Sequence, residues 1–291
     1  MQSATHPADH LSTKLFEAVA QLVQAHTGIK LPATKRTMLE GRLRRRVRAA
    51  GCRSLDEYAA QVVQTQEGPE FDRLINAITT NKTEFFREPA HYEWLQNRII
   101  PELVKTRKRS PAMIKLWSAA CSTGAEAFSA AMVLQDLMIQ RRDFQYAILG
   151  TDISTEVLAE AEAAIYPSAM MDQVWSDKRA RYVMPAKDPR RDISRIAPEL
   201  RQRVTFRQLN LTDSSYSVDG DVDVIFCRNV LIYFQREMQE AVVRKLASHL
   251  RPGGFLLLGH SESMAANGAP WLRQIGPTVL QAPADGKNGV P

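Results

Sequence analysis

The fold is decided by one stretch of the sequence, Val224-Ile225-Phe226-Cys227-Arg228-Asn229-Val230-Leu231-Ile232-Tyr233-Phe234. With Val222 just before it, the stretch begins as a short apolar run, which is typical of a strand buried inside a parallel sheet. Where the strand should end, an arginine, an asparagine and then a tyrosine follow. In open α/β sheets, ligands bind outside the carboxyl ends of the strands, so these polar residues are candidates for a binding site. A capped strand-to-helix turn is the alternative interpretation, and three other strand ends favour the site.

Apolar runs of the same kind recur along the rest of the chain, alternating with helical periodicity. Strands are predicted at 113–120, 146–151, 204–209, 222–227 and 254–259, and helices at 125–140, 155–164 and 236–250. This alternation predicts an α/β fold with a parallel sheet covered by helices. The Arg- and Pro-rich stretch from about Tyr166 to Arg203 does not fit it and is too long for a simple loop. It is predicted to be a small inserted subdomain with strand-like pieces at 181–184 and 192–196.

The N-terminal part is predicted to be a small helical domain. The spacing of its apolar residues predicts helices at 11–27, 34–50, about 55–65 and 69–79. Gly28 and Gly51 are expected to end the first two helices, and Ser54 to cap the third. We therefore expect a helical domain over 1–85, a linker over 86–110 and an α/β domain over 111–285, with the insertion at about 172–203.

The composition of the chain limits the class of protein to which it can belong. The chain has 291 residues, of which 44% are hydrophobic and 24% charged, with no apolar run near the roughly 18 residues that span a bilayer. The segment Met1–Pro7 lacks the features of a signal peptide. The three cysteines form no metal-ligand pattern, and reduced thiols are expected. These features predict a cytoplasmic protein that has no metal site and does not insert into a membrane.

Net charge is +6, and much of it lies in one predicted helix. Between Lys35 and Arg53, eight basic residues accompany a single acid, Glu40. Arginine binds carboxylates in a bidentate geometry, which favours docking to an acidic surface. The residues proposed for docking are Arg42, Arg45, Arg46 and Arg48. A solvated face is one alternative and nucleic acid is another, although no aromatic residue lies among these arginines to stack on bases.

The first predicted strand ends in small residues, Ser118-Ala119-Ala120-Cys121-Ser122-Thr123-Gly124, followed by Ala125-Glu126. Small residues let the backbone turn tightly and approach a ligand just before a helix N-terminus. The three spaced glycines of a dinucleotide site are missing. Glu126 would repel a pyrophosphate and suits a cationic ligand. Tight packing alone is the alternative interpretation.

Two further strand ends carry polar residues. Asp152 ends the second strand, where a carboxylate can accept hydrogen bonds from ribose hydroxyls. The alternative is that Asp152 caps the next helix, although Ser154 can also serve as that cap. Asn210 and Leu211 follow the next strand, where an amide and an apolar side chain can read and cover an adenine ring.

Four motifs in sequence order closely resemble the CheR family, the S-adenosylmethionine-dependent methyltransferases of bacterial chemotaxis receptors. They are Asn81-Lys82-Thr83-Glu84-Phe85-Phe86-Arg87-Glu88, the segment Trp117–Gly124, the segment Phe226–Phe234 and Gly259-His260-Ser261-Glu262. The resemblance extends from the basic helix to about Ala282. The sequence departs from the common pattern of the family at Cys121, Ala125, Ala127 and Phe128. These departures affect the expected shape of the pocket for the methionine part of the cofactor.

The resemblance implies a class I (Rossmann-like) methyltransferase domain, an all-helical N-terminal domain and a small inserted β-subdomain. It implies S-adenosylmethionine as cofactor, S-adenosylhomocysteine as product, and acidic helical bundles of methyl-accepting receptors as partners of a monomeric enzyme. The implied cofactor contacts are Asn81, Thr83, Arg87, Glu126, Asp152, Asn210, Leu211, Arg228 and Asn229.

The implied reaction makes a methyl ester on a glutamate side chain. Such a carboxylate has an unperturbed pKa near 4.3 and is already ionised at neutral pH, so no general base is required. Catalysis should come from holding the reacting atoms in line. Arg87 or Arg228 is expected to align a carboxylate, and Tyr233 to orient the reacting groups. A nucleic-acid methyltransferase and a non-catalytic cofactor-binding module are the alternatives.

Overall fold

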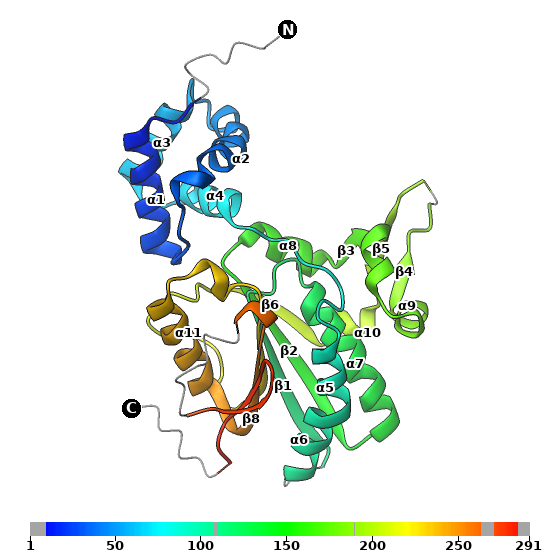
Figure 1. Cartoon of the computed structure of the whole chain (residues 1–291). Helices are drawn as coiled ribbons and strands as arrows, with labels where there is room; N and C mark the ends of the chain where they lie inside the picture. Colours follow the sequence, from blue (N-terminus) through cyan, green and yellow to red (C-terminus); the bar gives the residue numbers. More distant parts are fainter. Residues whose placement is uncertain (1–9, 108–109, 189, 263–270, 285–291) are drawn as a thin grey trace.

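The computed structural model describes residues 10–107, 110–188, 190–262 and 271–284. The Met1–Pro7 segment and the extreme ends of the expected domains lie outside these residues. None of the helices within these ranges combines the length and the apolar character that spanning a bilayer requires. Figure 1 shows a helical region above a sheet that is covered by helices, with a smaller sheet to one side.

The helical region contains the four expected helices. They are α1 (Thr13–Thr27), α2 (Arg36–Ala49, after the 3-10 turn η2, Ala33–Lys35), α3 (Leu55–Thr65) and α4 (Pro69–Ile78). Gly28 ends α1 with φ of 72°, Gly51 follows α2 with φ of 70°, and Ser54 Oγ accepts from the N–H of Glu57 at the start of α3. Apolar residues of all four helices share one core, including Val19, Leu39, Tyr58 and Leu74.

The main sheet has seven strands in the order β6-β2-β1-β7-β8-β10-β9. The strands are β1 (Ala112–Ala119), β2 (Phe144–Asp152), β6 (Val204–Gln208), β7 (Val222–Cys227), β8 (Leu250–Leu258), β9 (Arg273–Gly276) and β10 (Val279–Gln281). The first five in the order are parallel, which confirms the α/β prediction, whereas β10 is antiparallel to β8 and to β9. The sequence analysis missed β9 and β10, which are short strands at one edge of the sheet.

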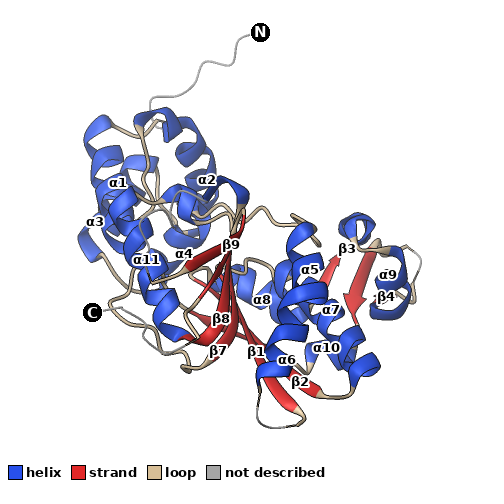
Figure 2. Ribbon diagram, turned by 60° about the horizontal axis from the view of Figure 1, so that its bottom comes forward, coloured by secondary structure: helices blue, strands red, loops and turns tan. Residues whose placement is uncertain are grey.

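Helices cover both faces of this sheet (Figure 2). They are α5 (Ala90–Trp94), the π-helical turn η3 (Leu95–Ile99), α6 (Ile100–Thr106), α7 (Ala125–Arg141), α8 (Thr155–Ala163) and α11 (Arg236–His249). Alternate residues of β7 serve the two cores: Val224 and Phe226 join one, and Ile225 and Cys227 the other. This alternation is what a strand buried on both faces requires.

The segment 86–110 differs from the expected linker. Its helical turns α5, η3 and α6 bury Tyr92, Leu95, Ile99 and Leu103 in the same core as β1 and α7. The prediction of a linker is therefore wrong for the part of this segment that the structure describes, because its apolar residues cover the sheet.

The inserted stretch forms a second, three-stranded antiparallel sheet. It contains β3 (Ile165–Pro167), β4 (Val183–Pro185) and β5 (Ile193–Ile196) in the order β3-β5-β4, with η4 (Ser168–Gln173), α9 (Ser176–Tyr182) and α10 (Pro198–Arg201) around them. Of these strands, β4 and β5 lie near the two expected strand-like pieces, and β3 was not predicted. A buried carboxylate anchors the insertion to α7: Asp136 pairs with Lys178 and Arg181 and accepts from the hydroxyl of Tyr182.

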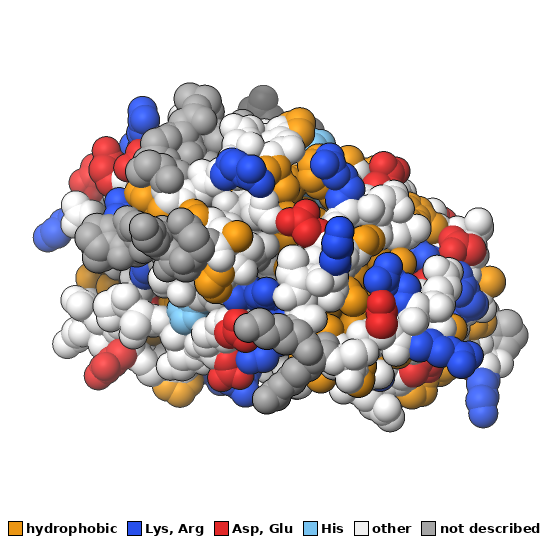
Figure 3. All heavy atoms as spheres, turned by 90° about the horizontal axis from the view of Figure 1, so that it is seen from below, with side chains coloured by type: hydrophobic (Ala, Val, Ile, Leu, Met, Phe, Trp, Pro, Cys, Tyr) orange, Lys and Arg blue, Asp and Glu red, His pale blue; other side chains and the backbone are white. Residues whose placement is uncertain are grey.

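Charges on the side facing away from the helical region are of mixed sign (Figure 3). Near the start of β7, the buried Asp223 pairs with Arg107 at 2.7 Å and with Arg251 at 3.0 Å. These ion pairs lie at the edge of the sheet opposite to the carboxyl ends of the parallel strands.

Candidate functional site

A cleft lies at the carboxyl ends of the parallel strands. Its empty space, including the opening to solvent, is about 1240 Å³, which is ample for a small molecule given that such sites commonly measure ~300–1,000 Å³. All nine residues expected to contact the cofactor line it, as does Tyr233. These nine are Asn81, Thr83, Arg87, Glu126, Asp152, Asn210, Leu211, Arg228 and Asn229. The fold thus brings together residues from five distant segments, while their individual roles remain predictions.

The small-residue turn after β1 is strongly bent. Ala120, Ser122 and Gly124 have φ of 60°, 51° and 84°, in the left-handed region. A side chain on Gly124 would come within 2.9 Å of Ala161 Cβ, so a glycine is needed there. Ser122 Oγ donates to the carbonyl of Asn81, which joins this turn to the first motif.

Asp152 holds two backbone segments together at the end of β2. Its Oδ2 accepts from the N–H of Ser122 at 2.9 Å, and its Oδ1 from the N–H of Ser154 at 3.0 Å. The side chain is buried, and burial raises the pKa of the carboxyl, although the backbone hydrogen bonds offset part of this shift. Ser154 is the N-cap of α8, so Asp152 is not needed for that purpose. Its expected contact with a ribose remains a prediction.

The most buried charge in the cleft is Arg228, whose side chain is 1% exposed. Its Nη1 lies 3.1 Å from Glu126 Oε2, its Nη2 lies 3.2 Å from Glu88 Oε2, and Nη2 also donates to the carbonyl of Arg87. Burial lowers the pKa of Arg228, but the two carboxylates outweigh that effect, so its pKa is raised and it stays charged. Both terminal nitrogens of Arg228 thus already have acceptors within the protein. Arg228 therefore has less capacity to align the carboxylate of a bound ligand than the sequence analysis expects.

Glu126 lies at the start of α7 and accepts a further hydrogen bond from Ser118 Oγ at 2.6 Å. Burial raises the pKa of its carboxyl, and the Arg228 guanidinium offsets part of the shift. Two carboxylates, Glu88 and Glu126, therefore share one guanidinium. With both ionised, the cluster has a net charge of −1.

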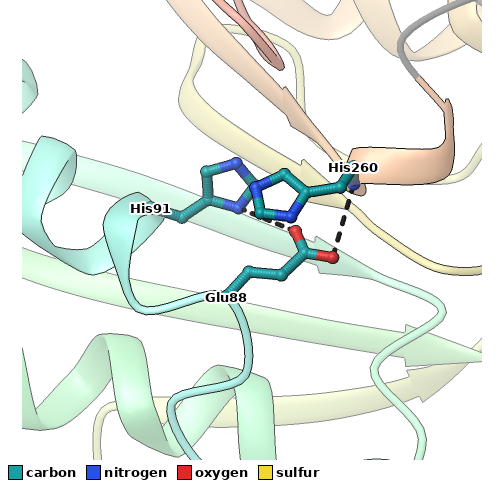
Figure 4. Close-up of side chains that lie close together, drawn as sticks. All are labelled: Glu88, His91 and His260. Carbon is teal, nitrogen blue, oxygen red and sulfur yellow. Dashed lines mark hydrogen bonds and ion pairs between the residues drawn. The ribbon is translucent and has the colours of Figure 1, made fainter.

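Glu88 also meets two histidines (Figure 4). Ligand atoms of Glu88, His91 and His260 lie within 4.8 Å of one another, a spacing at which a metal ion could be held. The Glu88 carboxylate, however, is already paired with Arg228 and accepts from Asn229 Nδ2 and from the N–H of His260. A divalent cation would have to compete with this buried guanidinium, which would repel it. We therefore assign Glu88 to the support of Arg228.

The helical region forms one wall of the cleft, which the sequence analysis missed. Thr27, Ile29, Lys30, Leu31, Lys35 and Met38 all line it. At Gly28 an added Cβ would lie 2.9 Å from Thr212 Cγ2, so the end of α1 packs closely on the α/β part. Asn210 Nδ2 donates to the carbonyl of His26 at 2.6 Å, so this side chain, expected to read an adenine, also joins the two regions.

On the basic helix α2, two of the four arginines proposed for docking have partners within the helical region. Arg42 donates to the carbonyls of Ile78 and Thr79 at the end of α4, at 2.6 and 2.8 Å. Arg46 makes a bidentate pair with Glu70. Both are held inside the helical region, because their acceptors lie on a helix that packs against α2. Docking therefore stays a prediction for the exposed Arg45 and Arg48.

Three supporting residues received no role from the sequence analysis. Glu88 pairs with Arg228, Tyr92 Oη accepts from Arg228 at 3.4 Å, and Glu262 accepts three backbone hydrogen bonds beside Asn229. Glu88 and Glu262 lie within the quoted motifs, and that position was the one sign in the sequence that they support the site. Tyr92 lies in the segment expected to be a linker.

Two family models match the chain. One, described as CheR methyltransferase, SAM binding domain, matches residues 81–279, and the other, CheR methyltransferase, all-alpha domain, matches residues 14–79. Chemotaxis protein methyltransferases of Klebsiella aerogenes and Escherichia coli are each 36% identical over 255 residues, covering 88% of this chain and 85% and 86% of theirs. That of Borreliella burgdorferi is 34% identical over 249 residues, covering 85% of this chain and 87% of its own.

Proposed function

This chain belongs to the CheR family of S-adenosylmethionine-dependent chemotaxis methyltransferases, and from that premise we propose that it esterifies glutamate side chains of chemoreceptors. The observation that carries the proposal is the division of charge in the cleft. Acidic side chains predominate in its buried part, and basic side chains at its exposed part.

The buried part suits a cationic group. Arg228 shares its single positive charge between Glu88 and Glu126, and Asp152 adds another buried carboxylate on the same cleft. S-adenosylmethionine, when bound, supplies an electrophilic methyl group on a positively charged sulfur. The residues proposed to hold it are the nine cleft residues named above, with Asp152 at the ribose and Asn210 and Leu211 at the adenine.

The exposed part suits an anionic acceptor. Lys30, Lys35 and Lys82 are exposed and line the cleft, where Glu84 is the exposed acid. Clefts that carry one sign of charge raise the local concentration of ligands of the opposite sign. A receptor surface rich in glutamate would be attracted to this opening, and Arg45 and Arg48 on α2 would extend the attraction.

The proposed acceptor needs positioning more than activation. A glutamate carboxylate is ionised at neutral pH, so the chain has no proton to remove from it. Arg87, half-buried in the wall of the cleft, is proposed to align a carboxylate, and Tyr233, half-buried at the same opening, to orient the reacting groups. Arg228 would act mainly by fixing the carboxylates around it.

Nucleic acid is the less favoured acceptor. Of the four arginines considered for docking, two are engaged by Glu70 and by backbone carbonyls, which leaves a smaller basic surface for phosphates.

The test is incubation of the protein with methyl-labelled S-adenosylmethionine and cytoplasmic receptor fragments. Base-labile label on glutamate, lost when the modified glutamates are changed to alanine, is the expected result. Base-stable label, or label transferred to RNA or DNA in parallel incubations, would contradict the proposal.

A further inference from the structure

The carboxylate of Glu262 makes three hydrogen bonds to backbone N–H groups after the ends of β7 and β8. Its Oε2 accepts from Asn229 at 2.7 Å and from Gly259 at 2.8 Å, and its Oε1 accepts from Leu231 at 2.7 Å. The side chain is buried, and among the described residues no ion pair joins it. Backbone dipoles alone therefore compensate this buried charge, which makes each bond costly to lose.

The backbone held in this way has an unusual conformation. Asn229 has φ of 60°, in the left-handed region, which residues with a side chain adopt rarely and asparagine more readily than most. This turn follows Arg228 and precedes Tyr233, and all three side chains line the cleft. A small rotation of the turn would therefore move several cleft side chains at once.

The surroundings leave Glu262 little freedom. A Cβ added to Gly259 would lie 2.6 Å from Glu262 Oε2 and 2.9 Å from the backbone nitrogen of Asn229. The side chain of Asn229 is held separately, because its Nδ2 donates to Glu88 Oε1 at 3.2 Å. Glu262 thus holds the backbone of the turn, and Glu88 holds its side chain.

We propose that Glu262 is a positioning residue of the cleft, which fixes the turn at Asn229 so that Arg228, Asn229 and Tyr233 face the cofactor and the acceptor. This rests on the proposed roles of those three residues. Glu262 itself does not line the cleft, so it would act only through the backbone that it holds.

The first test is Glu262→Gln. The amide is close in size to the carboxylate but replaces one acceptor oxygen with an NH2 group, which would face a backbone donor. We expect kcat to fall about 10-fold or more and the Kd for S-adenosylhomocysteine to rise about 5-fold or more, measured where circular dichroism shows a folded protein. Ser261→Ala, at the exposed neighbouring residue, is the control and should behave as wild type.

The second variant, Gly259→Ala, places a Cβ against both Glu262 Oε2 and the backbone nitrogen of Asn229, so it disturbs the hydrogen bond between them without changing any charge and serves if Glu262→Gln does not fold. It should weaken binding and turnover in the same direction. Gly220→Ala is its control, since a Cβ there meets nothing within 4 Å.

A purely structural Glu262 would give folded variants with wild-type kcat and Kd and only a lower melting temperature, and that result would overturn the proposal. Failure of the wild type to methylate receptor fragments would count against the proposed function alone. The Kd values of the variants for S-adenosylhomocysteine, measured by calorimetry, would still test the positioning role of Glu262.

Discussion

The hydroxyl of Tyr166 donates to the carbonyl of Thr123 at 2.7 Å. Tyr166 is the central residue of β3 in the inserted subdomain, and Thr123 belongs to the small-residue turn after β1. The Tyr166 ring also meets Phe85 of the first motif edge-on, with ring centroids 5.0 Å apart. The insertion therefore helps to hold the turn that forms one wall of the cleft.

Tyr166→Phe should lower stability by ~0.5–1.5 kcal/mol, the usual net value of one hydrogen bond, and should weaken cofactor binding by at most that amount, because the turn at Thr123 is less well held. Calorimetric titration with S-adenosylhomocysteine measures this change. Tyr146→Phe is the matched control: its buried hydroxyl bonds to Gln135 on α7, away from the cleft lining. Both variants should lose similar stability, and an equal loss of affinity in both would refute a specific role for Tyr166.

Asp152→Ala should weaken cofactor binding by ~1.5–3 kcal/mol, as expected for lost hydrogen bonds to a charged group. Part of this loss would come from Ser122 and Ser154, whose N–H groups Asp152 holds. Ser154→Ala removes only the hydroxyl that caps α8 and keeps the N–H that bonds to Asp152, so it should leave the affinity nearly unchanged. An unchanged calorimetric affinity in Asp152→Ala would remove this residue from the binding site.

Exchanging both Arg45 and Arg48 for glutamine should impair receptor methylation, with cofactor affinity and melting temperature unchanged. The reason is that these two side chains are exposed and are proposed to attract an acidic surface, so the deficit should shrink as salt rises. Initial rates at several salt concentrations measure this.

Arg42→Gln is the contrasting variant for this experiment. It removes hydrogen bonds to the end of α4 and should destabilise the protein by ~1–3 kcal/mol. If the Arg45 and Arg48 double variant methylates receptor normally at low salt, the exposed face of α2 is only a solvated surface.

Tyr233→Phe should lower turnover about 10-fold with little change in stability, because it keeps the ring and deletes one hydroxyl. Steady-state kinetics together with thermal unfolding measure both quantities. Wild-type turnover in this variant would make Tyr233 a packing residue and leave Arg87 and Arg228 to position the reacting groups.

Acidification should destabilise the protein through His91. Burial, together with the nearby charge of Arg228, lowers the pKa of His91 from 6.5 to about 3. The unfolded chain therefore binds a proton below pH 6.5 that the folded chain rejects, so the His91 contribution to stability is complete above pH 6.5. It is lost as pH falls toward 3, by about 1.4 kcal/mol per unit at most.

Urea unfolding of wild type and His91→Gln between pH 7.5 and 5 measures this contribution. The variant should show a shallower decline than wild type. Parallel curves for the two proteins would show that His91 titrates normally in the folded state.

Much of the fold follows from local pattern. Apolar runs of strand length, alternating with helical periodicity, predicted the five parallel strands, and Gly28, Gly51 and Ser54 marked helix ends correctly. The cleft was also foreseeable, because parallel strands must bring their carboxyl ends to one edge, and Asp152, Asn210 and Arg228 each follow a strand there.

Only the tertiary structure decided which charges are available and which are engaged. Arg42, Arg45, Arg46 and Arg48 look alike in the sequence, yet Arg42 bonds to carbonyls 36 and 37 residues away and Arg46 to an acid 24 residues away. Arg228 likewise pairs with Glu126 and Glu88, which lie 102 (228 − 126) and 140 (228 − 88) residues before it in the sequence. Periodicity reports which face of an element is apolar, but the partner of a polar side chain depends on which elements pack together.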